Sequence, residues 1–205
     1  MQRVKPWSQA CENNREPILR VLRDYFTTPG TIIEIGSGTG QHAVYFAQHL
    51  PHLYWQPTDR QENLPGIAMW AEEADAANLL SPVCLDVTVQ PWPVSRAAGV
   101  FAANTAHIMG WAGVEAMFAG AARILDEGGR FCLYGPSMIG GLHTSDSNAR
   151  FDAMLRARDP ASGIRDVDAL QELGEHCSLR LIDDRPMPAN NRTLVWEKRP
   201  GNAPF

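Results

Sequence analysis

The sequence predicts an α/β domain in which a mostly parallel sheet carries helices on both faces. Short apolar segments, several of them β-branched, alternate along the chain with segments whose apolar residues recur at helical spacing. The last two strand-like segments are separated by a loop without a helical pattern, which favours an antiparallel hairpin at the edge of the sheet. A chain of 205 residues suits one such domain.

Each expected element rests on a local pattern. The strand segments are short and apolar, whereas the helical segments place apolar residues three and four positions apart. Strands are expected at residues 31–35, 53–56 (ending near Asp59), 83–85, 98–103, 130–134, 179–182 and 193–197. Helices are expected at residues 17–26, 43–50, 63–78, 114–125 and 166–176. Pro51 and the pair Gly128-Gly129 mark the ends of two of these helices.

Three segments lie outside this regular alternation. Residues 1–16 are polar and are expected to form an irregular arm or lid before a domain that spans residues 17–199. Within that domain, residues 135–166 are polar and rich in glycine, so we expect an active-site loop with one or two helical turns near Phe151. Residues 200–205 are expected to be a tail.

Composition excludes several classes of function. The 18 Lys and Arg residues against 23 Asp and Glu give a net charge of -5, so no basic excess is present to neutralise nucleic-acid phosphates. The apolar stretches are too short to cross a bilayer, and the four cysteines contain no C-x-x-C pair. We therefore expect a cytoplasmic protein, a monomer or homodimer, that binds no nucleic acid, no membrane and no metal.

A glycine-rich loop follows the first expected strand. Gly36, Gly38 and Gly40 form a G-x-G-x-G pattern, which lets the backbone approach a ligand closely, and the next helix offers free N–H groups at its start. The spacing differs from the G-x-G-x-x-G of dinucleotide enzymes, and no P-loop Gly-Lys-Ser/Thr follows. A tight turn without a ligand is the alternative, but three alternating glycines exceed what such a turn needs.

The segment E-I-G-S-G-T-G-Q, which begins at Glu34, resembles the first motif of class I S-adenosylmethionine-dependent methyltransferases. More narrowly, the chain resembles the methyltransferase-like family catalogued as domain of unknown function 938, from about residue 17 to 198. The segments that carry this second resemblance are residues 14–19, 34–42, 103–104 with 107–108, 147–148 with 151–152, 163–166 and 187–191. The resemblance implies a Rossmann-like seven-stranded sheet in the order 3-2-1-4-5-7-6, with the last strand antiparallel. It also implies S-adenosyl-L-methionine as cofactor and S-adenosyl-L-homocysteine as product.

The same resemblance implies roles for acids at the strand ends. Asp59 would accept the ribose hydroxyls, with a surface residue that caps the next helix as the alternative. Asp86 would meet the adenine amine and Val87 would pack on the ring, with a simple turn as the alternative. Glu34 would lie close to the methionine end of the cofactor. The residues expected to contact the cofactor are Glu34, Gly36, Ser37, Gly38, Gly40, His42, Asp59, Asp86, Val87 and Asn104.

The methyl acceptor is expected beyond the carboxyl ends of the strands, where open α/β sheets bind ligands. His107 follows the fourth strand and is a candidate general base, because the ordinary pKa of histidine suits proton removal near neutral pH. A histidine that only packs is the alternative. Asn104 and Tyr134 complete the expected catalytic set. Substrate contacts are expected from Asn14, Trp111, Asn148, Arg165, Asn190 and Asn191, with packing, loop capping or local pairing as alternatives.

These observations together predict methyl transfer from S-adenosyl-L-methionine to a small polar molecule. A small molecule is favoured over a protein or nucleic acid because the chain has neither a basic stripe nor an added recognition domain. Two alternatives stay open. One is a protein that binds the cofactor without catalysis, as a sensor or scaffold, and the other is an NAD-dependent oxidoreductase, which the glycine spacing disfavours.

Overall fold

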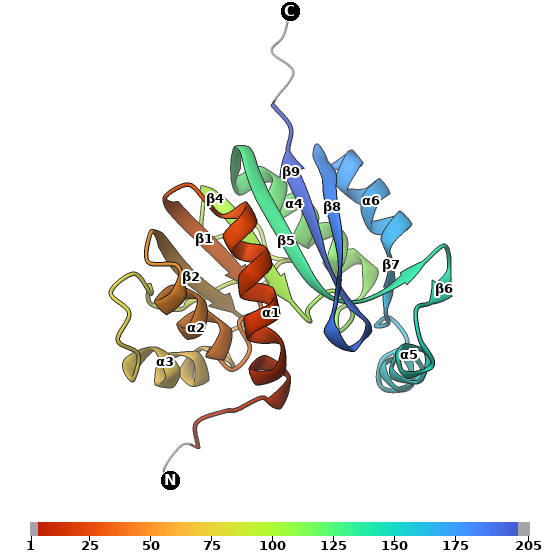
Figure 1. The fold of residues 1–205 in the computed structure, drawn as a ribbon, viewed down its shortest axis with the longest axis horizontal. Helices are drawn as coiled ribbons and strands as arrows, with labels where there is room; N and C mark the ends of the chain where they lie inside the picture. The colour runs from red at the N-terminus through yellow and green to blue at the C-terminus, as the bar shows by residue number, and fades with distance from the viewer. Residues whose placement is uncertain (1–3, 201–205) are drawn as a thin grey trace, which may run out of the picture.

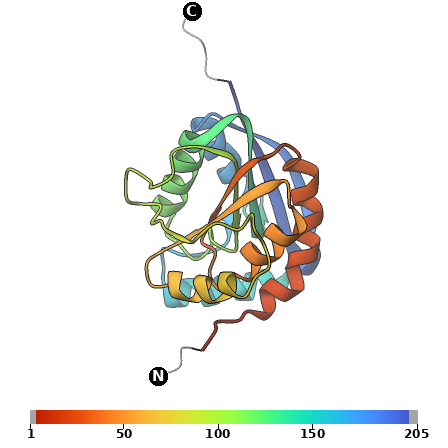
Figure 2. The same cartoon turned by 90° about the vertical axis from the view of Figure 1, so that its left-hand side faces the viewer.

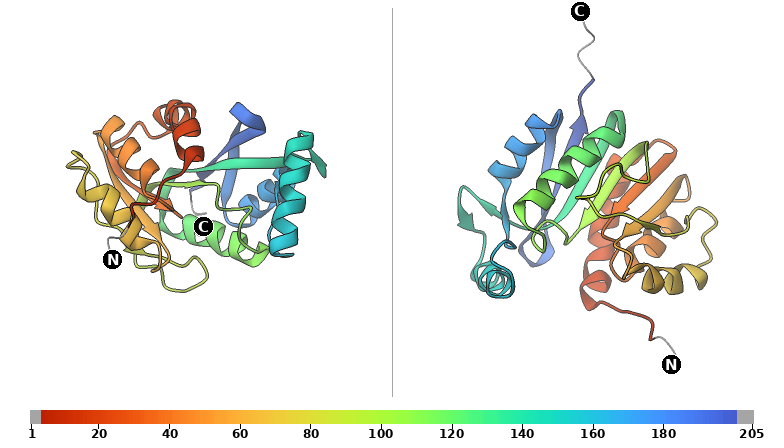
Figure 3. Two further views of the ribbon diagram at one scale, coloured as in Figure 1. Left: turned by 90° about the horizontal axis from the view of Figure 1, so that it is seen from below. Right: turned by 180° about the vertical axis from the view of Figure 1, so that it is seen from behind.

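A twisted sheet with helices packed on both faces forms the body of the protein (Figure 1). The structure is a computed structural model that describes residues 4–200, so most of the expected tail lies outside the described residues. On one face lie α1 (Gln9–Tyr25) and α2 (Gln41–His49), and on the other lie α4 (Trp111–Ile124) and α6 (Val167–His176). The views in Figures 2 and 3 show these two layers of helices with the sheet between them.

The sheet has the expected order. Strand β1 (Gly30–Ile35) pairs in parallel with β2 (Leu53–Asp59) on one side and β4 (Ala97–Ala103) on the other. Beyond these, β3 (Val83–Cys84) joins β2 and β5 (Leu125–Ile139) joins β4, both in parallel. The edge is an antiparallel pair, β9 (Asn191–Lys198) beside β5 and β8 (Leu179–Met187) outermost.

The strand count exceeds the expected seven. The sheet within residues 4–200 has nine strands, because β6 (Leu142–His143) and β7 (Arg165–Asp166) each pair with the far end of β5. Without these two short strands, the order is the predicted 3-2-1-4-5-7-6. The prediction missed them because they are short and mostly polar, Leu-His and Arg-Asp, and so lack the apolar pattern that indicated β3.

Two hydrophobic cores lie on opposite faces of the sheet, as alternating strand residues require. On the side of α4 and α6, the fully buried strand residues include Ile33, Val100, Phe131 and Trp196. Their sequence neighbours on the side of α1 and α2 include Ile32, Phe101, Cys132 and Val195. Because both faces are covered, the central strands are mostly apolar, and Glu34 of β1 and Thr58 of β2 are buried polar exceptions near their carboxyl ends.

The N-terminal helix begins earlier than the sequence indicates. The expected irregular arm at residues 1–16 is wrong from residue 9 onward, since α1 starts at Gln9 and continues through Pro17. One side of its polar first half meets other polar groups: Gln41 Nε2 donates to Glu12 Oε1 at 2.8 Å, and Asn14 is buried. A helix that buries polar side chains has no apolar stripe there, so hydrophobic periodicity could not reveal it.

The segment expected as a loop at residues 135–166 is largely ordered into elements. It contains the end of β5, then β6, α5 (Asp146–Arg158) and β7. Ser145 Oγ caps α5 by accepting from the amide of Asn148 at 3.1 Å, while Asp152 Oδ1 accepts from the amide of Ile164 at 2.7 Å. The buried residues of α5 are Asn148, Asp152 and Leu155. Because two of these three are polar, hydrophobic periodicity does not predict the helix.

The third helix is shorter than expected. α3 (Leu64–Glu72) ends six residues before the expected end at 78. Asn78 leaves the helix because its side-chain amide donates to the carbonyls of Ala47, Leu50 and Leu53, and so ties the chain to the end of α2. None of the helices within residues 4–200 has the length and apolar character that crossing a bilayer requires.

Candidate ligand-binding site

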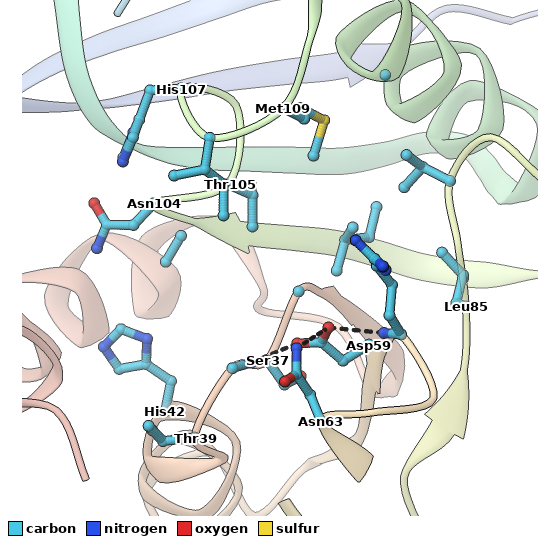
Figure 4. Close-up of a pocket in the computed structure, with 18 of the residues that line it drawn as sticks. Ser37, Thr39, His42, Asp59, Asn63, Leu85, Asn104, Thr105, His107 and Met109 are labelled. Atoms are coloured by element: carbon cyan, nitrogen blue, oxygen red, sulfur yellow. Dashed lines mark hydrogen bonds between the residues drawn. The ribbon is translucent and has the colours of Figure 1, made fainter. Parts of the chain in front are cut away.

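A cavity of about 790 Å³ opens at the carboxyl ends of the parallel strands. It lies where β1 has β2 on one side and β4 on the other, the point at which open α/β sheets bind ligands. Its wall comes from the loops after β1, β2, β3 and β4, from the start of α1 and from Phe151 of α5. Figure 4 shows Asp59 and Asn63 at one end and His42, Asn104 and His107 at the other.

The glycine loop has a backbone that only glycine adopts readily. Gly36 and Gly40 have φ of 71° and 91°. A Cβ on Gly36 would lie 2.5 Å from Cγ2 of Thr105, so this glycine lets the loop after β4 approach the loop after β1. Gly40 forms the turn into α2 against Ile67 and does not line the cavity, whereas Gly36, Ser37 and Gly38 do.

Asp59 is held by three donors at the cavity wall. Its Oδ2 accepts from the amide of Gly38 at 2.7 Å, and its Oδ1 accepts from the amide of Arg60 at 2.7 Å and from Nδ2 of Asn63 at 2.8 Å. The carboxylate is nearly buried, yet it borders the cavity. The three donors occupy three of its roughly four lone-pair sites, so Oδ2 can accept a hydroxyl group of a ligand without moving.

Glu34 lies beneath the glycine loop and does not line the cavity. Its Oε2 accepts from Nε1 of Trp55 at 3.0 Å. Burial raises the pKa of Glu34 to about 7, although hydrogen bonds from Trp55 and Ser37 act in the opposite direction. Trp55 is thus the partner of this buried acid, and the structure places Glu34 as a support of the loop.

The loop after β3 forms the side of the cavity beyond Asp59. Oδ1 of Asp86 accepts from the amide and the hydroxyl of Thr88, at 2.9 and 2.7 Å, and these bonds lower the pKa of Asp86. Asp86 therefore makes the simple turn that was the alternative to ligand contact, and it lines the cavity as well. Leu85 and Val87 add apolar surface beside it.

His42 borders the cavity from α2, and its ring is held by contacts with other residues of the protein. Its Nε2 lies 2.7 Å from Oδ1 of buried Asn14, and its ring stacks on Phe46 with the centroids 5.2 Å apart. Burial lowers the pKa of His42 to about 4, so the ring is neutral near pH 7. Asn14 also hydrogen-bonds Tyr134, and neither of these two residues lines the cavity.

Asn104 and His107 are placed together by an unusual backbone conformation. Asn104 has a φ of 58°, and its amide donates to the carbonyl of Tyr134 at 2.8 Å, which turns the chain toward the cavity after β4. The ring of His107 meets that of Phe151 edge to face, with the centroids 5.3 Å apart. Burial first, and then the nearby charge of Arg165, lower the pKa of His107 to about 4.

The residues expected to contact substrate from the chain's second half do not line this cavity. Nδ2 of Asn148 donates to the carbonyl of Asn190 at 2.9 Å, and Nδ2 of Asn191 donates to that of Pro188 at 3.1 Å. Asn190 itself is exposed and has a φ of 59°. These contacts match the loop-capping alternative and join α5 to the turn between β8 and β9.

Trp111 and Arg165 also bond within the protein. Nε1 of Trp111 donates to Oε1 of Glu115 at 3.1 Å. Arg165 donates to backbone carbonyls of the loop after β4, and it borders a small second cavity of about 10 Å³ together with His107 and Tyr134. Arg165 was expected to bind a substrate carboxylate, and in this structure three of its donors are occupied by the protein.

Sequence reasoning missed several lining residues. Ser8 and Cys11 reach the cavity only because α1 begins so early, and Gln41 fixes that start by accepting from the amide of Ser8 at 2.6 Å. Thr105 and Phe151 were also missed as wall residues. Residues 4–200 contain no group of three or more His, Cys, Asp or Glu side chains placed to hold a metal ion.

Residues 5–198 match the family described as "Protein of unknown function (DUF938)". The chain belongs to this family. The DUF938 chain also shares its fold with solved methyltransferases. An O-methyltransferase family protein from Burkholderia thailandensis has a TM-score of 0.81 and 14% identity, covering 94% of this chain and 58% of the other. Human N-acetylserotonin methyltransferase, in complex with SAM, has a TM-score of 0.78 and 13% identity, with 94% and 53% covered.

A third structure of this kind contains a small molecule. An O-methyltransferase family 2 protein from Planctomyces limnophilus, in complex with apigenin, has a TM-score of 0.74 and 17% identity, with 91% of this chain and 62% of the other covered. These likenesses establish the fold of class I methyltransferases for the DUF938 chain. The chain spans a little over half the length of these three proteins.

Proposed function

We propose that the DUF938 chain transfers a methyl group from S-adenosyl-L-methionine to a small polar molecule. The observation that carries this proposal is the preformed contact between Asp59 and the glycine loop at the mouth of a 790 Å³ cavity. A carboxylate there, with a free lone pair on Oδ2 and at the end of the second strand, suits a hydroxyl of a ribose. The shared fold with the methyltransferases named above supports the same assignment.

The residues present fit such a nucleoside. Asp59 accepts a ribose hydroxyl on Oδ2, and the apolar side chains of Leu85, Val87 and Met109 border the region where an adenine ring would be enclosed. Gly36 and Gly38 leave room for a ligand to approach the backbone. When bound, the cofactor supplies a methyl group on a positively charged sulfur. The chain's own task is then to place a nucleophile in line with that methyl group and to exclude water.

His107 is the group proposed to remove a proton from the acceptor. Its low pKa keeps the imidazole neutral at physiological pH, so a ring nitrogen has a lone pair available, but it also makes the ring a weaker base than an ordinary histidine. Asn104 lies beside it at the same end of the cavity and orients the acceptor by hydrogen bonding (Figure 4). Phe151 packs on the His107 ring and covers that end against water.

The charge distribution of the wall supports a small acceptor without phosphate groups. The charged lining residues, Asp59, Arg60, Glu62 and Asp86, come from the loops after β2 and β3. Asn104, Ile108 and Phe151, which line the cavity with His107, carry no charge of their own. An acceptor held by hydrogen bonds and apolar contact fits this end better than a polyanion does.

Calorimetric titration of the purified chain with S-adenosyl-L-homocysteine tests the cofactor assignment. We expect micromolar affinity, and no heat of binding from NAD. Labelled S-adenosyl-L-methionine is then incubated with fractions of a metabolite extract, with the chain carrying His107→Ala as control. Transfer that depends on His107 supports the proposal. Tight binding without transfer to any fraction favours the non-catalytic sensor, and absence of binding by the folded chain contradicts both.

A further inference from the structure

Arg165 reaches from β7 into the loop that carries His107. Its Nε donates to the carbonyl of Ala106 at 3.0 Å, and its Nη2 donates to the carbonyl of Met109 and, at 3.0 Å, to that of Ala161. One guanidinium group therefore joins two carbonyls of the loop after β4 to a third from the segment after α5. The planar fork of arginine fixes all three directions at once, which a lysine ammonium cannot do.

The same segment holds the loop at a further point. The amide of Gly163 donates to the carbonyl of His107 at 2.9 Å, so the carbonyls of residues 106, 107 and 109 are all bonded from residues 163–165. Position 163 requires glycine, because its φ is 144° and a Cβ there would lie 2.7 Å from the Arg156 guanidinium and 2.8 Å from Oδ1 of Asp152. Asp152 Oδ1 accepts from the next amide, that of Ile164, at 2.7 Å.

The His107 side chain depends on this backbone clamp for its orientation. Within residues 4–200, the hydrogen bonds of the structure include none to a ring nitrogen of His107. Its only ring contact there is the edge-to-face packing on Phe151, which belongs to the same inserted segment. The ring of a catalytic base is normally oriented by a hydrogen bond to a second group. For His107 the orientation of the ring follows instead from the position of its own backbone, which the segment 163–165 holds.

We propose that Arg165 is the positioning residue of the acceptor end: it fixes the backbone of residues 106–109 so that His107 faces the cavity, and it does not contact the acceptor. The catalytic meaning of this role rests on the function proposed above. The role itself is a property of the free protein and can be measured without a cofactor or an acceptor.

The charged and titratable groups around His107 determine how its pKa should respond when Arg165 is replaced. The cation that faces the ring is Arg165 from β7, and Tyr134 from β5 borders the same small cavity. From α5 the ring meets uncharged Phe151, while Asp152 pairs with Arg156 at 2.9 Å. Removal of the Arg165 charge therefore raises the pKa of His107, whereas a lysine at this position keeps the charge but loses the fork.

The experiment compares Arg165→Met and Arg165→Lys with Arg150→Met, a control on exposed Arg150 in α5. Amide hydrogen exchange of residues 106–109 and the NMR titration of His107 are measured on the protein alone. In R165M we expect exchange there to accelerate by about tenfold and the His107 pKa to rise by about one unit. In R165K we expect the faster exchange with a nearly unchanged pKa, and in R150M neither effect.

Unchanged exchange and titration in R165M would overturn the positioning role. So would an R165M chain that differs from wild type only in losing acceptors that carry a carboxylate, because that pattern indicates direct contact. If R165M does not fold, R165K decides through the exchange rate alone. Titration with S-adenosyl-L-homocysteine is run in parallel on the wild-type chain. Absence of binding would contradict the proposed function, whereas the positioning role of Arg165 would still be tested by amide hydrogen exchange of residues 106–109.

Discussion

The amide of Gly38 donates a 2.7 Å hydrogen bond to Oδ2 of Asp59, so the protein's own groups join the loop after β1 to the acid at the end of β2. Asn63 and the amide of Arg60 hold the other oxygen. The carboxylate is thus preorganised, and a ligand does not have to order it on binding.

Asp59→Ala should weaken binding of S-adenosyl-L-homocysteine by at least about tenfold, since a ligand hydroxyl loses a charged acceptor. The affinity of Asp59→Asn should lie between that of the wild-type chain and that of Asp59→Ala, because an amide oxygen accepts a hydrogen bond but carries no charge. Calorimetry measures both affinities. Asp75→Ala is the matched control, because Asp75 is exposed and does not line the cavity. An Asp59→Ala chain that binds as well as the control would remove Asp59 from the site.

His107→Gln should abolish methyl transfer and leave cofactor affinity unchanged. The neutral ring is the active form, and its pKa is lowered to about 4, so the transfer rate of the wild-type chain should stay level from neutral pH down to about pH 5 and fall as the pH approaches 4. His176→Gln, on an exposed residue of α6, controls for the general loss of a histidine. A rate that already halves near pH 6.5 would assign the proton transfer to a group with an ordinary histidine pKa.

The local patterns of the sequence sufficed for much of the fold and for one end of the site. The glycine loop and Asp59 lie at the cavity as predicted, because a strand end and a G-x-G-x-G turn depend on few distant contacts. The sheet order came from the family resemblance and is confirmed. The position of Asp86 at the cavity wall also follows from its place after β3.

The residues around the other end of the candidate site, near His107, could not be predicted from local sequence patterns. The early start of α1 depends on Glu12 and Asn14 finding polar partners on α2, and no periodic pattern encodes such a match. Arg165 and Asn148 were taken for substrate contacts because a polar residue in a long loop reads as free. Their partners are backbone carbonyls 59 and 42 residues away in sequence, which only the tertiary fold brings near.

Glu34 should make the protein less stable as the pH rises through 7. In the folded chain burial raises the pKa of Glu34 to about 7, so between its ordinary value and 7 the folded state binds a proton that the unfolded state does not. The free energy of unfolding therefore falls with pH across this window. Glu34→Gln keeps an oxygen acceptor for Trp55 and removes the charge, so relative to wild type it should gain stability on going from pH 5 to pH 8, by about 3 kcal/mol at most.

Urea unfolding at both pH values measures this gain, with Glu72→Gln as control because Glu72 is exposed. Should Glu34→Gln lower the stability equally at pH 5 and pH 8, the Glu34 carboxylate is charged and matched by a partner in the folded state.

Gly36→Ala should be more damaging than Gly38→Ala, for a reason that a third substitution can isolate. Both glycines have positive φ, 71° and 56°, so each alanine carries backbone strain of about 1–2 kcal/mol. Only at Gly36 does the new methyl group also meet Cγ2 of Thr105, at 2.5 Å, whereas the space around Gly38 is open.

We expect Gly36→Ala to lower the free energy of unfolding in urea by about 2 kcal/mol more than Gly38→Ala does. Thr105→Ser removes Cγ2, so combined with Gly36→Ala it should restore much of that difference, while combined with Gly38→Ala its effect should be purely additive. Additivity in both pairs would mean that the two loops do not touch at Gly36, and that the glycine is needed for its backbone angle alone.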